Sequence, residues 1–155
     1  MVGTADGEFS PNMPLTRAML VNILYREAGS PRGYSGTFTD IAPGRWYTNA
    51  VNWASTHDLV FGVGENRFAP NQPISRQDFA TILVRYARWA GIDLPQSRPA
   101  TVFNDSSNIA GYAENAVRAL YQARVVSGFP GGMFNPRGNT TRAESAVMLR
   151  NFLNL

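Results

Sequence analysis

The sequence contains no cysteine, no lysine and only one histidine among its 155 residues. Without cysteine the chain can form neither a disulfide nor a thiolate metal site, which fits an extracytoplasmic protein built without disulfides but does not require one. It also lacks an Asp-x-Asp-x-Asp run, which excludes a calcium loop of the common type. We therefore predict no metal site and no cofactor. The single histidine, His57, has only Asp58 as an acidic neighbour, which is too little to predict a general base.

All fourteen basic residues are arginines, and the net charge is a mild +3. Nucleic-acid-binding proteins gather basic residues in runs or on one face, whereas these arginines are spread along the chain. We therefore expect no nucleic-acid partner. No apolar run approaches membrane-spanning length and no signal peptide is visible, so we expect no membrane insertion, and a secretion signal would lie outside this sequence. The apolar share of 44% predicts a folded core.

One short stretch occurs three times in the chain. It joins Phe-x-Pro to a hydroxyl residue followed by Arg, with Phe and Arg eight positions apart. The copies are Phe9–Arg17, Phe68–Arg76 and Phe134–Arg142, and they begin 59 and 66 residues apart. A helical apolar pattern follows each Arg, so the stretch marks the start of three helices.

The hydroxyl residue of each copy is placed to cap the helix that follows. Its side-chain oxygen can accept a backbone N–H of the first turn, which has no partner within the helix. Asp78 and Glu144 stand three positions after two of the caps, which predicts a capping box there, whereas Met19 holds that position in the first copy. The three expected caps are Thr16, Ser75 and Thr141.

The arginine in the first helical turn opposes the helix dipole, at a cost on the order of a few tenths of a kcal/mol. Its presence in all three copies indicates a use. In one interpretation, the guanidinium and the helix N-terminus form a forked site for a carboxylate or a phosphate. In the other, each Arg pairs with a nearby carboxylate and fixes a loop. The residues alone leave both interpretations open.

Periodicity predicts five main helices in about two and a half repeats. Residues 35–94 and 100–155 each form a complete repeat, and residues 1–31 form the second half of another. Within the first complete repeat we expect helices at Trp46–His57 and Arg76–Ala90. Because such repeats bury their apolar faces against their neighbours, we expect one compact module. The expected inward residues are Leu20, Ile23, Leu24, Ala28, Tyr47, Ala50, Val51, Ala54, Phe79, Ile82, Leu83, Tyr86, Ala116, Val117, Leu120, Met148, Leu149 and Phe152.

These residues resemble the S-layer homology domain, a bacterial module usually found as three tandem copies. The shared features are a Phe-x-Asp loop, a helix led by an aromatic residue, a Gly turn, the Phe-x-Pro stretch and a Thr-Arg-Ala-Glu motif. The motif is intact at Thr141–Glu144, becomes Ser-Arg-Gln-Asp at Ser75–Asp78, and loses its carboxylate at Thr16–Met19. The resemblance covers nearly the whole chain.

The resemblance implies an all-α fold of tandem helix-loop-helix repeats around a pseudo-threefold axis, with the first repeat truncated. It implies a non-catalytic, extracellular module in the bacterial cell wall or S-layer. Grooves between repeats would bind secondary cell-wall polysaccharide, often through a pyruvate ketal on N-acetylmannosamine, and the motif Arg would contact the anionic group. The residues given a ligand-binding role in this way are Arg17, Arg76, Arg142, Thr16, Ser75, Thr141, Asp40, Asp105, Trp46, Tyr112, Gly62 and Gly128.

Several alternatives stay open at this point. Trp46 and Tyr112 suit either stacking on a sugar ring or core packing at a helix start, whereas packing between repeats is favoured for Trp53 and Trp89. A small carbohydrate-active enzyme would use two carboxylates, here from Asp40, Asp105 or Glu114. The first two hold equivalent positions in successive repeats, which favours a structural role. A further alternative keeps the module but gives it peptidoglycan or a protein as its partner.

The partial first repeat leads to two more expectations. A missing helix would leave apolar surface uncovered, so another chain or another segment would complete this repeat. Only two Phe-x-Asp loops are present, carrying Asp40 and Asp105, against three motif arginines. We therefore expect at most two complete grooves in one chain.

Overall fold

The computed structural model describes residues 8–155. This part of the chain contains five α-helices, one short 3-10 helix and no named strand, which confirms the predicted all-α class. The first seven residues of the predicted 1–31 repeat lie outside the described residues. The elements are α1 (Arg17–Glu27), α2 (Thr48–Thr56), α3 (Arg76–Ala90), η1 (Ser106–Asn108), α4 (Gly111–Gln122) and α5 (Arg142–Leu153).

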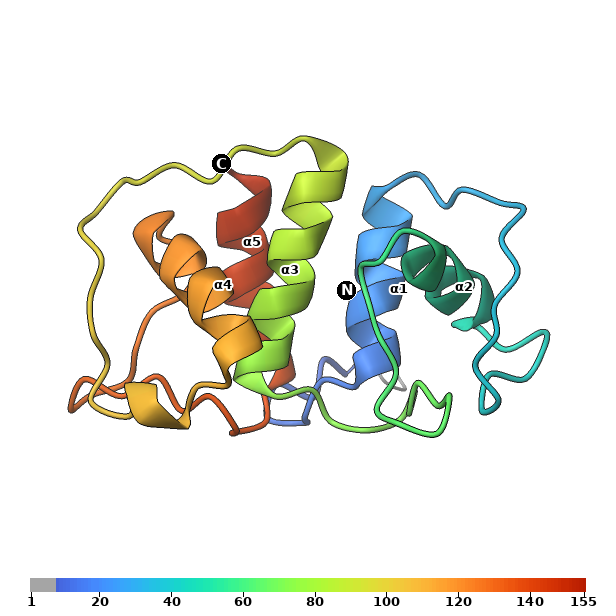
Figure 1. The fold of residues 1–155 in the computed structure, drawn as a ribbon, viewed down its shortest axis with the longest axis horizontal. Coiled ribbons are helices and arrows are strands. Elements are labelled where there is room, and N and C mark those ends of the chain that lie inside the picture. Colours follow the sequence, from blue (N-terminus) through green and yellow to red (C-terminus); the bar gives the residue numbers. More distant parts are fainter. Residues whose placement is uncertain (1–7) are drawn as a thin grey trace. The chain divides into compact units, whose positions relative to one another are not determined.

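The chain forms two compact units whose borders fall inside the repeated stretch. The smaller unit, Leu15–Pro73, holds α1 and α2, and the larger unit combines Met1–Pro14 with Ile74–Leu155 and holds α3, α4 and α5 (Figure 1). Within the units, α1 packs on α2 and α3 packs on α4. In both pairs the second helix of one predicted repeat packs on the first helix of the next. The limits of the two complete repeats, 35–94 and 100–155, remain a prediction from the sequence.

Trp53 is the centre of the smaller unit's core. It is fully buried on α2, and the centroid of its ring lies 5.6 Å from that of Tyr25 on α1. The predicted inward face of α1 was partly wrong, because Val21 and Tyr25 are buried whereas Ile23 and Ala28 are only half-buried. The buried face of α1 includes Tyr25 in place of Ala28. The Tyr25 ring packs against Trp53, and its hydroxyl donates to the Pro31 carbonyl at 2.9 Å. His57, the last residue of the helix predicted at Trp46–His57, is the C-cap of α2.

In the larger unit, α4 and α5 lie beside α3 (Figure 1). The rings of Tyr86 on α3 and Phe152 on α5 have centroids 6.1 Å apart, and Trp89 lies beside Tyr86 with 39% of its surface exposed. The predicted inward residues of the three helices are confirmed as buried; they are Phe79, Ile82, Leu83, Tyr86, Ala116, Val117, Leu120, Met148, Leu149 and Phe152.

The helix starts follow the predicted capping pattern with one difference. Thr16, Ser75 and Thr141 each accept the backbone N–H three positions on, and the Thr141–Glu144 pair completes a capping box. At Ser75 the shorter Asp78 carboxylate instead accepts the Ser75 hydroxyl at 2.7 Å, so the predicted box forms only in part.

The helix predicted from Trp46 begins at Thr48. The Thr48 hydroxyl accepts the Arg45 N–H at 3.1 Å and donates to the Ala42 carbonyl at 2.7 Å. These bonds hold residues 42–45 in a turn ahead of the helix. Trp46 therefore stands in the turn that leads into α2 and not in its first turn.

Candidate functional site

Arg76, the first residue of α3, is buried against the third copy of the repeated stretch. Its Nε donates to the Phe134 carbonyl at 2.9 Å and its Nη2 donates to the Ser127 carbonyl at 3.0 Å. The guanidinium carbon lies 5.0 Å from the centroid of the Phe134 ring and 4.5 Å from that of Phe129. The guanidinium thus contacts both backbone carbonyls and aromatic rings. These contacts fix the loop that carries Phe134.

Asp105 holds the same stretch from the opposite direction. The Phe134 N–H donates to one carboxylate oxygen at 2.8 Å, and the Asn135 N–H donates to the other at 2.7 Å. Asp105 is 5% exposed. Phe134 is therefore fixed at its N–H by an anion and at its carbonyl by a cation.

The smaller unit repeats this arrangement with Arg17 and Asp40. Arg17 Nε donates to the Phe68 carbonyl and Nη2 to the Phe61 carbonyl, both at 2.9 Å, and its guanidinium lies 4.7 Å from the centroid of the Phe68 ring. Asp40 accepts the Phe68 N–H at 2.8 Å and the Ala69 N–H at 2.7 Å. Both units thus contain the same arrangement, in which an aspartate binds the N–H and an arginine binds the carbonyl of one phenylalanine. We call this arrangement the clamp.

Arg142 makes the corresponding contact with the first copy of the stretch. Its Nε donates to the Phe9 carbonyl at 2.9 Å, and its guanidinium lies 4.9 Å from the centroid of the Phe9 ring. Arg142 is 3% exposed, and Arg17 and Arg76 are similarly buried. All three motif arginines therefore fix loops, which agrees with the loop-fixing interpretation, although the partners are mainly backbone carbonyls.

The first backbone N–H groups of these helices are also engaged. The N–H groups of Arg76 and Gln77 donate to the carbonyls of Gly138 and Pro136 at 3.0 Å each. The first two N–H groups of α1 make equivalent bonds to carbonyls of the second copy of the repeated stretch, and those of α5 to carbonyls of the first copy. An anion at these helix starts would therefore be recognised by side chains more than by free backbone donors.

The middle residue of Phe-x-Pro adopts a left-handed backbone conformation in every copy. Its φ is 49° at Ser10, 57° at Ala69 and 58° at Asn135. Such values are unfavourable for residues other than glycine, and for Ala69 most of all, since Asn adopts them more readily. The carboxylate clamp holds a strained turn in two of these copies, and strain of this kind gathers at functional sites.

Gly62 and Gly128 have a steric reason to be glycine. A Cβ on Gly128 would lie 2.7 Å from the Phe103 ring and 3.0 Å from the Met133 carbonyl oxygen, and one on Gly62 would lie 2.7 Å from the Arg67 carbonyl oxygen. Each glycine therefore lets its turn close on the phenylalanine of the Phe-x-Asp loop. The residues just before them, Phe61 and Ser127, supply the carbonyls that the arginines bind.

Tyr112 combines an exposed ring with a fixed hydroxyl. The ring is 59% exposed, the hydroxyl donates to Asp78 at 2.6 Å, and Gln77 Nε2 donates to it at 3.3 Å. Trp46, its counterpart in the smaller unit, is 58% exposed, and its ring lies nearly perpendicular to that of Tyr47. Neither ring is part of a core, so the core-packing alternative is wrong for both.

Asp40 and Arg76 each have a shifted pKa. Burial raises the pKa of Asp40, but the hydrogen bonds from Phe68 and Ala69 and the nearby Arg67 outweigh it, and the net pKa lies below the usual value. Burial lowers the pKa of Arg76, against the opposing effect of Glu144 and Asp105. Asp40 is therefore an anion at neutral pH, which suits a clamp and not a proton donor.

The structure also contains contacts that no sequence pattern predicts. Arg98 donates from Nε to the Tyr121 carbonyl and from Nη2 to the Val126 carbonyl, both at 2.6 Å, and lies over the Tyr121 ring. It fixes the segment before the Phe103 loop to the end of α4. No repeated motif marks this arginine, so only the fold identifies its role.

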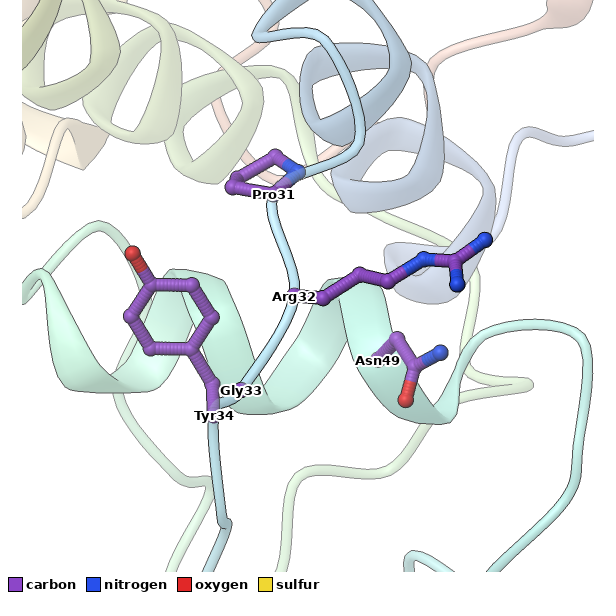
Figure 2. Close-up of a pocket in the computed structure, with 5 residues that line it drawn as sticks. All are labelled: Pro31, Arg32, Gly33, Tyr34 and Asn49. Carbon is purple, nitrogen blue, oxygen red and sulfur yellow. The ribbon is translucent and has the colours of Figure 1, made fainter.

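One concavity in the smaller unit has a volume of about 330 Å³ and is lined mainly by the segment after α1. Figure 2 shows Arg32 and Asn49 pointing to the same side of it, with the Tyr34 ring on the other side. No motif residue lines this concavity.

The carboxylates weighed as an enzymatic pair do not meet in one unit. Asp40 belongs to the smaller unit and Asp105 to the larger one, and both oxygens of each accept backbone N–H groups. Among residues 8–155 no group of three potential metal ligands comes together. Within the same range no helix is long and apolar enough to cross a membrane.

Comparison with known proteins agrees with the resemblance. The family model of the S-layer homology domain matches residues 1–18, 37–80 and 102–146. The chain is 32% identical over 97% of its length to an amylopullulanase of Thermoanaerobacterium thermosulfurigenes, of which it covers 8%. It is 25% identical to a cellulosome-anchoring protein of Acetivibrio thermocellus, over 97% of this chain and 34% of that protein. It is also 25% identical to the surface-layer 125 kDa protein of Lysinibacillus sphaericus, over 94% of this chain and 12% of that protein.

The chain thus spans a small part of each of these relatives. Several relatives of the chain are cell-surface, surface-layer or cell-wall proteins by name. The predicted localisation, outside the cell at the bacterial cell wall or S-layer, is confirmed.

Proposed function

Because the chain belongs to the S-layer homology domain family, we propose that it is a non-catalytic module that anchors a larger protein to the cell wall. Its ligand is a pyruvylated secondary cell-wall polysaccharide, bound where a motif arginine and an exposed aromatic ring come together. The names of the relatives, which include a cellulosome-anchoring protein and surface-layer proteins, support the anchoring part.

Tyr112 carries the proposal. Its exposed ring is tied through its hydroxyl to Gln77 and Asp78, the two residues that follow Arg76. Gln77 in turn accepts the Ala110 N–H at 2.9 Å through its Oε1, which fixes the start of α4 beside the start of α3. The Tyr112 ring is thus held at the start of α3, the helix that begins with Arg76. An aromatic face and a guanidinium suit a sugar ring that carries a carboxylate.

The roles of the site residues follow from this arrangement. Arg76 and Arg17 supply the cation, and Tyr112 and Trp46 supply the aromatic face. Gly62 and Gly128 let their turns pack closely against the Phe-x-Asp loops. The caps Thr16, Ser75 and Thr141 and the clamps Asp40 and Asp105 hold these groups in place, so their contribution is positioning. Arg142 is the third cation, and no Phe-x-Asp loop in this chain corresponds to its stretch.

We further propose that the repeats are related by a pseudo-threefold axis. The three contacts Arg17–Phe68, Arg76–Phe134 and Arg142–Phe9 support it, because each arginine binds the phenylalanine of the next copy and the last binds that of the first. With two Phe-x-Asp loops, one chain has at most two complete sites. Calorimetric titration with a short pyruvylated saccharide should give a stoichiometry of two or less, and three equivalent tight sites would reject this assignment.

The deciding experiment is sedimentation of the purified chain with wall polysaccharide, before and after removal of its pyruvate groups. We expect binding to the pyruvylated form only. Tyr112→Ala should weaken binding about tenfold, because the aromatic face is lost. Tyr112→Phe is the matched control, since it keeps the face and loses only the hydroxyl. Equal binding to both forms of the polysaccharide would reject the anionic ligand, and turnover of the polysaccharide would reject a non-catalytic role.

A further inference from the structure

The third nitrogen of Arg76 faces a carboxylate of its own chain. Nε and Nη2 donate to backbone carbonyls, whereas Nη1 lies 3.8 Å from Glu144 Oε1 on α5. The Arg76 side chain is 6% exposed and that of Glu144 is 31% exposed. An external carboxylate that approaches Nη1 therefore meets Glu144 at the same nitrogen.

Glu144 is held in this position by the helix start and not only by the arginine. Its Oε2 accepts the Thr141 N–H at 2.9 Å and the Thr141 hydroxyl at 3.2 Å. The capping box thus fixes the carboxylate while its Oε1 points to Arg76. A ligand cannot displace Glu144 without some change at the start of α5.

We infer that Glu144 is a specificity-determining residue that competes with the ligand carboxylate for Arg76. Two carboxylates at one guanidinium repel each other, so a small free carboxylate gains little there. A pyruvylated saccharide gains further contacts from the Tyr112 ring and can offset the repulsion. This last part rests on the proposed function, whereas the competition at Nη1 does not.

Glu144→Gln tests the inference because it removes the charge and keeps an acceptor for the Thr141 N–H, and Gln serves in capping boxes as Glu does. The probe is sodium pyruvate, followed through the side-chain Nε–H signal of Arg76 in ¹⁵N-labelled protein. We expect the dissociation constant for pyruvate to fall about tenfold relative to the unmodified chain. Glu27→Gln, an exposed carboxylate of the smaller unit, loses the same charge and should leave it unchanged.

Equal affinity for pyruvate in the unmodified chain and in Glu144→Gln would overturn the inference. Should Glu144→Gln fail to fold, Glu144→Asp withdraws the carboxylate by one methylene, as Asp78 does at Ser75, and should also bind pyruvate more tightly than the unmodified chain. An unchanged dissociation constant in this variant would be equally decisive. If no variant binds the polysaccharide while Glu144→Gln still gains affinity for pyruvate, the proposed function fails and the competition at Arg76 stands.

Discussion

The Nε of Arg142 donates to the carbonyl of Phe9 at 2.9 Å, although the two residues stand 133 positions apart. The same bond joins Arg17 to Phe68 and Arg76 to Phe134, at separations of 51 and 58 positions. A motif that repeats along the sequence is therefore used between copies and not within one copy. This contact explains why α1, α3 and α5 each carry an arginine in the first turn against the dipole.

Arg76→Lys should destabilise the chain although it keeps the charge. Lysine lacks the planar fork and cannot donate to the Phe134 and Ser127 carbonyls together. We expect the free energy of unfolding to fall by about 1–3 kcal/mol, measured by urea denaturation. Arg118→Lys, on the exposed side of α4, should be neutral. Equal stability of the two variants would show that the fork does not hold the loop.

Asp105→Asn should cost about 1.5–3 kcal/mol of stability. The amide oxygen can accept one of the two N–H groups of Phe134 and Asn135, but the amide nitrogen faces the other and leaves it unsatisfied. The exposed Asp93→Asn provides the control, with no expected change in urea midpoint. A stable Asp105→Asn variant with unaltered amide signals at Phe134 and Asn135 would contradict the clamp.

Asp40 should make stability depend on pH in the acid range. Its pKa in the folded chain lies below the ordinary value of an aspartate carboxyl, so the unfolded chain binds the proton more readily. This contribution is fully present above the unfolded pKa and is lost as pH falls through the folded pKa. Urea midpoints measured from pH 6 down to pH 3 (roughly the range that spans the ordinary carboxyl pKa) should fall less steeply for Asp40→Asn. Parallel curves would show that this carboxylate contributes nothing.

Gly128→Ala should destabilise the chain by about 1–3 kcal/mol, the usual cost of overpacking. The new methyl group would lie 2.7 Å from the Phe103 ring and 3.0 Å from the Met133 carbonyl oxygen. Gly111→Ala is the matched control, because nothing lies within 4 Å of its Cβ and the residue opens α4. That control should be neutral or slightly stabilising, since alanine favours a helix over glycine. The same loss in both variants would point to backbone entropy and not to the close approach.

The sequence by itself determined the elements and their repetition. Apolar periodicity predicted the five helices, and the hydroxyl residues before Arg17, Arg76 and Arg142 predicted where three of them begin. These signals are local, because helix faces and caps depend on residues within one or two turns. The start of α2 was predicted wrongly because it depends on more than apolar periodicity. It is set by the hydrogen bonds of Thr48 to the preceding turn.

Only the tertiary structure decided what the motif residues touch. The sequence left open what Arg76 contacts, and the fold shows its Nε and Nη2 on carbonyls 58 and 51 positions away, which leaves Nη1 as the nitrogen for the proposed anion. It also left Tyr112 between core and surface, and the fold exposes its ring because its hydroxyl is held by Gln77 and Asp78 on another helix. Contacts between distant segments depend on how helices pack, and no pattern within a single repeat encodes them.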